Sequence, residues 1–119
     1  MAVAPAVRTA VAPDAKFGEM TCITWTLASG DTATPVSFAE YTDRAVQITG
    51  DDGGGTVTMA GSLDGTNYVT LTDPQGNALS FTTTAIEQIA EATIWIMPVL
   101  TGGSGGSINV ILFGKRGRF

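Results

Sequence analysis

The sequence predicts an all-β protein, a two-sheet β-sandwich of jelly-roll-like type with about eight short strands and an extended N-terminal arm. Three observations predict this fold. Apolar and polar residues alternate over short segments, as in Thr21–Leu27. Turn-forming Gly and Asp residues separate these segments at intervals of about 8–12 residues. Threonine, a β-branched residue that suits strands, occurs 18 times.

The expected strands follow one another along most of the chain. Gly-rich and Asp-containing turns at 50–55, 64–65, 73–77 and 101–107 separate several of them. The segments predicted as strands are 21–27, 36–38, 45–49, 56–63, 68–72, 78–84, 93–100 and 108–113. Between the segments 78–84 and 93–100, residues 85–91 are predicted as a helical turn or two, because Ile86, Ile89 and Ala90 are spaced i, i+3, i+4.

The chain divides into three parts by composition. Residues 1–19 repeat the tetrapeptide Ala-Val-Ala-Pro, and proline favours extended backbone, so we expect an extended N-terminal arm. Residues 20–114 form the predicted β-sandwich domain. Residues 115–119, which contain Lys115, Arg116 and Arg118, form a basic C-terminal tail.

Composition argues against several function classes. The chain contains no histidine, so it lacks an imidazole base and a Ser-His-Asp triad, and Cys22 is its single cysteine. We therefore expect no enzyme, no cofactor and no bound metal. The longest apolar run, Ile94–Leu100, is far shorter than a membrane span, and the N-terminus lacks the pattern of a secretory signal. We expect a soluble protein made in the cytoplasm.

Three groups of residues leave alternatives open. Turn aspartates could gather around Ca²⁺, although Asp is also an ordinary turn former. Trp25 and Trp95 could stack on a sugar, but both lie in apolar strand segments that suit a core. Cys22 has no histidine partner and is expected to be a structural thiol. The aspartates considered for Ca²⁺ are Asp51, Asp52, Asp64 and Asp73.

Charge is distributed unevenly. The net charge is −5, yet three of the six basic residues lie in the last five positions. The remaining 114 residues carry 3 basic and 11 acidic groups. An acidic body disfavours nucleic-acid binding, which needs a basic face. The basic tail suits either an acidic patch on a partner protein or plain solvation.

The segment Gly61–Leu79 carries a resemblance to a known group of proteins. Together with Val99–Gly103 and the final apolar strand, it resembles small structural proteins of tailed phages and prophages, over roughly residues 57–118. The resemblance is greatest to capsid decoration, or cement, proteins. It implies a homo-oligomer on the outer capsid surface of a virion that binds the major capsid protein. The residues expected to make inter-subunit contacts are Val3, Val7, Val11, Lys115, Arg116, Arg118 and Phe119.

A second function stays open at this point. The hairpin Ser62-x-Asp64-Gly65-x-x-Tyr68 also resembles hairpins of sugar-binding sandwiches. That resemblance implies a carbohydrate-binding β-sandwich of a phage tail or baseplate. Trp25, Tyr68 or Trp95 would then line a shallow groove at the surface.

Overall fold

The structure is a computed structural model that describes residues 3–10, 20–28, 30–39, 41–51, 55–103 and 106–116. Its described residues contain strands and no helix, so none of them forms a helix that could cross a membrane. In chain order the strands are β1 (Val3–Ala4), β2 (Val7–Ala10), β3 (Met20–Ala28), β4 (Thr32–Ala33), β5 (Val36–Ser37), β6 (Tyr41–Asp51), β7 (Thr56–Ser62), β8 (Val69–Thr70), β9 (Ser80–Phe81), β10 (Ala85–Ile89), β11 (Trp95–Thr101) and β12 (Ser107–Arg116).

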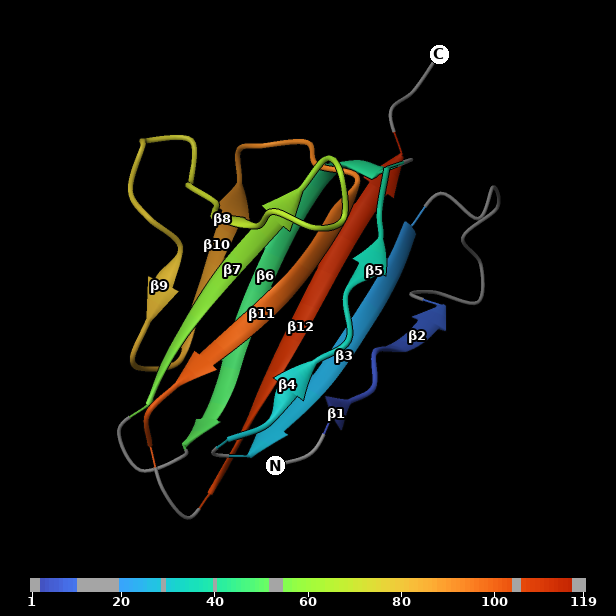
Figure 1. The fold of residues 1–119 in the computed structure, drawn as a ribbon. Coiled ribbons are helices and arrows are strands. Elements are labelled where there is room, and N and C mark those ends of the chain that lie inside the picture. The colour runs from blue at the N-terminus through green and yellow to red at the C-terminus, as the bar shows by residue number, and fades with distance from the viewer. Residues whose placement is uncertain are drawn as a thin grey trace.

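Two antiparallel sheets pack face to face (Figure 1). The first, here called the β12 sheet, has the strand order β10-β6-β12-β3-β2. The second, the β11 sheet, has the order β5-β11-β7-β8, and β9 also pairs with β7. The chain changes sheet at each step from β5 to β7 and again from β9 to β12. This alternation, with β3 and β12 side by side, is the arrangement of a jelly roll, and the predicted fold class is confirmed.

The core lies between the sheets and follows the strand alternation. On β3, Ile23, Trp25 and Leu27 are completely buried and meet the buried Met59 and Ile96 of the β11 sheet. The indole Nε1 of Trp25 donates a hydrogen bond of 2.8 Å to the carbonyl oxygen of Thr34. Burial of each large apolar side chain contributes about 1.5–3 kcal/mol, so this core is the main source of stability.

One charged side chain lies inside the sandwich. Arg44 on β6 is 2 % exposed, and its guanidinium donates to three backbone carbonyl oxygens. Nε reaches the oxygen of Tyr41 at 2.7 Å, and Nη2 reaches those of Phe38 and Thr93, each at 2.6 Å. Because Thr93 lies just before β11, Arg44 ties the two sheets together. Desolvation lowers the pKa of this guanidinium.

The described part of the predicted N-terminal arm lies against its own domain. β1 pairs in parallel with β4, and β2 pairs with β3 along the edge of the β12 sheet. Residues 1–2 and 11–19 lie outside the described part of the chain. At the other end, β12 continues to Arg116, so the ladder reaches into the segment predicted as a tail.

The predicted helical turn at 85–91 is wrong. Residues 85–89 form β10, which pairs along β6 from Ala85 opposite Ile48 to Ile89 opposite Arg44. Ile86 is exposed and Ile89 is buried, so the two point to opposite faces, as strand geometry requires for an odd separation. Ladder hydrogen bonds with β6 outweigh the weak helical spacing of so short a segment.

Candidate interaction surface

The outer face of the β12 sheet, turned away from the core, is the most distinctive surface of the described chain. The residues that point outward alternate with the core residues on each strand. They form cross-strand rows, because antiparallel partners point to the same side. The outward residues of this face are Met20, Cys22, Thr24, Thr26, Asp43, Ala45, Gln47, Thr49, Ile86, Gln88, Asn109, Ile111, Phe113 and Lys115, with Val7 on the edge strand β2.

The middle rows of the outer face are largely apolar. Phe113 of β12 lies in register between Cys22 of β3 and Ala45 of β6. In the next row, Ile111 neighbours Gln47, which in turn pairs with Ile86 of β10. An antiparallel sheet usually presents a polar face to water, so apolar rows here are unusual.

Two shallow depressions mark the centre of this face. Their volumes are about 330 Å³ and about 220 Å³, and Ala45, Ile86 and Phe113 line both. Ile86 is 65 % exposed. At one end the surface becomes charged, where Lys115 lies in register with Asp43. The outer face thus combines an apolar centre with an oppositely charged pair at its end.

Cys22 lies on this face and is half-buried. Burial raises the pKa of its thiol, because the thiolate is desolvated there. The thiolate is the nucleophile, so a raised pKa makes Cys22 less reactive at neutral pH. Its surroundings suit packing rather than covalent chemistry.

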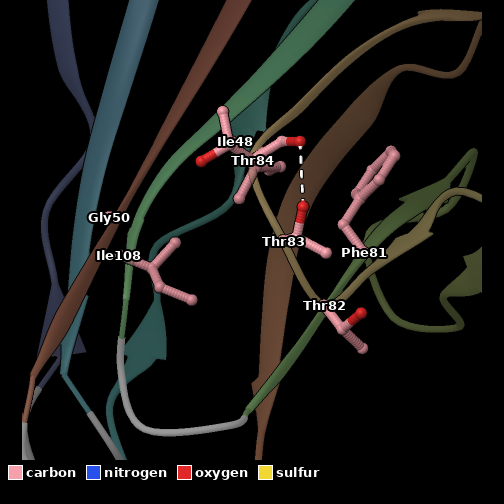
Figure 2. A pocket seen from close by; sticks show the side chains of 7 residues that line it. All are labelled: Ile48, Gly50, Phe81, Thr82, Thr83, Thr84 and Ile108. Atoms are coloured by element: carbon pink, nitrogen blue, oxygen red, sulfur yellow. Dashed lines mark hydrogen bonds between the residues drawn. The ribbon is translucent and has the colours of Figure 1, made fainter.

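A third depression, of about 260 Å³, lies where the end of β6 and the start of β12 face the segment that follows β9 (Figure 2). Ile48 and Ile108 form one wall, and Phe81 with the threonines at 82–84 forms the other. The hydroxyl of Thr83 donates to the carbonyl oxygen of Thr84 at 3.2 Å. Its lining contains hydroxyl, backbone and apolar groups without a charged side chain, which suits a docked side chain better than a reaction.

The aromatic residues considered for sugar stacking lie in different environments. Trp25 is fully buried and is excluded as a stacking platform. Trp95 is half-buried, and Gly65 lies so near that a Cβ there would be 3.1 Å from its Nε1. Tyr68 is half-buried in the same hairpin.

Two of the turn aspartates, Asp64 and Asp73, use their carboxylates to hold their own turns. Asp64 accepts hydrogen bonds of 2.8 Å from the backbone N–H groups of Thr66 and Asn67 and from the hydroxyl of Ser62. These bonds hold the pKa of Asp64 well below its usual range. Asp73 accepts similarly from the backbone of its own turn. In the described part of the chain, no three His, Cys, Asp or Glu residues gather as a metal site would require. Asp52 lies outside the residues that the structure describes.

The predicted contact residues are spread over both ends of the chain. Val3 lies on β1, and Val7 on β2 is 55 % exposed. Lys115 is exposed near the end of β12, and Arg116 is the last residue of that strand. Val11, Arg118 and Phe119 lie outside the described residues. The structure therefore brings Lys115 to the outer face, whose centre the sequence analysis did not identify. The apolar run Val110–Phe113 could have indicated it, because a strand with only one buried face should alternate.

The sequence matches no protein-family model, and a search of curated proteins also gave no match. Among solved structures, the fold is similar to the SPBc2 prophage-derived protein YomS, with a TM-score of 0.64 and 13 % identity. That similarity covers 81 % of this chain and 94 % of YomS. A cysteine peptidase from Thevetia peruviana latex, Peruvianin-I, also matches, with a TM-score of 0.43 and 10 % identity over 83 % of this chain and 52 % of that one. At this identity the likeness to YomS establishes the fold, and a TM-score of 0.43 supports no further inference.

Proposed function

We propose that this protein is a non-enzymatic structural component of a phage virion, which decorates the outer capsid surface and links neighbouring major capsid subunits. The observation that carries the proposal is the jelly-roll fold, shared across 94 % of the length of a protein described as prophage-derived. The resemblance of Gly61–Leu79 to segments of phage structural proteins supports it independently. The protein would be made in the host cytoplasm and would reach the particle after the shell has formed.

The chemistry of the chain supports a binding role. The sequence contains no histidine, and the pKa of Cys22 is raised, so neither a usual base nor an activated thiol is at hand. The carboxylates of Asp64 and Asp73 accept hydrogen bonds within their own turns. A rigid sandwich with these properties fits a protein that holds other proteins in place.

Two surfaces suit the proposed contacts with the shell and with other copies. The C-terminal segment, with Arg116 and Arg118, concentrates positive charge on an otherwise acidic chain. It would face an acidic patch on the major capsid protein. The apolar centre of the outer face is suited to a protein partner rather than to solvent.

The location in the particle is tested on virions purified from the source phage. We expect mass spectrometry to detect this protein in them, and cryo-electron microscopy to show its sandwich on the outside of the head at capsid-subunit boundaries. Density on the tail or neck would contradict the decoration role while keeping a virion role. Absence of the protein from purified particles would contradict both.

The charge contact is tested by co-sedimentation with empty shells that lack the protein. We expect Arg116→Glu combined with Arg118→Glu to weaken attachment, most clearly at low salt, where charge pairs are least screened. Arg116→Lys combined with Arg118→Lys is the control, because it changes the same two side chains and keeps their positive charge. Equal binding by the Arg→Glu variant and the wild type would rule out the charged contact.

A further inference from the structure

The apolar centre of the outer face lacks a covering layer among the described residues. The β11 sheet covers only the opposite side of the β12 sheet, as Figure 1 shows. Ile86 keeps 65 % of its surface exposed, and Phe113 and Ala45 line both depressions beside it. Contiguous apolar surface on a small protein marks an interaction site. The question is which partner fits this face.

The order of side chains on β12 and β6 is self-complementary. In register, Lys115 neighbours Asp43, and two residues along the strands Phe113 neighbours Ala45. Consider a two-fold axis that runs parallel to these strands and passes between them. It places Lys115 opposite Asp43 of the second copy and the large Phe113 opposite the small Ala45. A single axis therefore matches both charge and side-chain size.

We propose that the protein forms a two-fold symmetric dimer by packing the outer faces of two β12 sheets together. The proposal rests on the homo-oligomer of the proposed function and specifies its interface. Two sheets packed in this way lie about 10 Å apart with nearly aligned strands, which the axis allows. Two-fold interfaces of this kind use the same patch on both copies.

The available area suits a small, reversible interface. With the axis between β12 and β6, the strands β10, β6, β12 and β3 overlap with the second copy. At about 4.8 Å between strands and about 6.7 Å between outward rows, four rows on β6, β12 and β3 and two rows on the shorter β10 cover about 450 Å² on each copy. The total of about 900 Å² is the size of a small interface, which suits a dimer that dissociates in the micromolar range. The charged pair at the rim would set the register of the two copies.

The apolar contact is tested with two matched variants in sedimentation-velocity experiments over the micromolar range. Ile86→Glu places a charge on the outer face, and Leu63→Glu places one on a side chain of similar exposure, 68 %, in the hairpin after β7. We expect the wild type and Leu63→Glu to dimerise equally. Ile86→Glu should raise the dimer dissociation constant about tenfold or more. Circular dichroism confirms that both variants are folded.

The charged contact is tested by mixing two variants. Lys115→Asp alone sets the introduced aspartate opposite Asp43 of the second copy, and Asp43→Lys alone sets the introduced lysine opposite Lys115. Each variant should therefore dimerise about tenfold more weakly at low salt. An equimolar mixture should recover dimers, because both oppositely charged contacts re-form between unlike copies. A charge pair within one chain could not be restored by mixing.

Three outcomes would overturn the dimer: a monomer at every concentration, equal effects of Ile86→Glu and Leu63→Glu, or no recovery in the mixture. Each is measured on the purified protein alone. A monomer that still binds shells would overturn this interface and leave the proposed function standing. If the protein dimerises through this face but is absent from purified virions, the interface stands and the proposed function is overturned.

Discussion

The ring of Phe38 lies directly against Gly114 of β12, so closely that a Cβ on Gly114 would be 2.3 Å from the ring Cζ. Phe38 is completely buried and also packs against Tyr41, with ring centroids 4.6 Å apart. The glycine therefore makes room for the aromatic residue that closes this end of the core. In a close-packed interior neither group has space to move away.

Gly114→Ala should lower the free energy of unfolding by about 1–3 kcal/mol, because the added methyl group overpacks the core. Urea denaturation measures the loss. The control is the same substitution in a Phe38→Leu background, where the shorter side chain leaves room. There the cost should be smaller by at least about 0.5 kcal/mol. Equal costs in both backgrounds would show that the ring is not the obstacle.

Arg44→Met should destabilise the protein by about 2–4 kcal/mol, because it leaves buried carbonyl oxygens without donors. Those oxygens belong to Phe38, Tyr41 and Thr93. Arg44→Lys should not restore stability, since a compact ammonium cannot reach all three as the planar guanidinium does. Denaturation of both variants tests this. Wild-type stability of Arg44→Lys would mean that charge alone, and not the fork geometry, holds the sheets together.

The sequence was sufficient to predict the sandwich, because strands such as Thr21–Leu27 alternate cleanly and glycines mark the turns. It was misleading at 85–91, where Ile86 and Ile89 have helical spacing but lie on opposite faces of an edge strand. The burial of Arg44 depends on carbonyl groups brought together from distant segments, which no local pattern reveals. The outer face was missed because only the alternation of apolar and polar residues was used to assign strands, whereas Val110–Phe113 is apolar on both faces.

The two tryptophans should differ sharply in fluorescence. The Trp95→Phe variant retains Trp25, which is 0 % exposed and hydrogen-bonded to Thr34, so its emission should be blue-shifted and resist iodide quenching. The Trp25→Phe variant retains the half-buried Trp95 and should be quenched more strongly. Strong quenching of Trp25 would contradict its burial and revive the sugar-binding alternative for that residue.

Asp64 should remain ionised well below the usual pH range of an aspartate. Hydrogen bonds from Asn67, Thr66 and Ser62 lower its pKa in the folded state below the unfolded value of about 3.9. The stabilisation is therefore present above pH of about 4 and is lost as the pH falls through the lower, folded value. Carbon-detected NMR of the side-chain carboxyl should show a titration midpoint well below that of a free aspartate. Asp64→Asn should melt with less acid dependence than the wild type, and an identical acid dependence would contradict the role of this carboxylate.

The rate at which the Cys22 thiol reacts should depend on pH and on the proposed dimer. Because burial raises the pKa of its thiol, the rate of reaction with iodoacetamide should rise with pH around a midpoint above that of a free cysteine, about 8.5. In the dimer the neighbouring Phe113 and the second copy cover the thiol further, so the rate should fall as protein concentration increases. Ile86→Glu should show the same pH midpoint when dilute but no dependence on concentration. A midpoint at or below that of free cysteine would contradict the desolvation of this site. A rate independent of concentration in the wild type would contradict the coverage of Cys22 by a second copy.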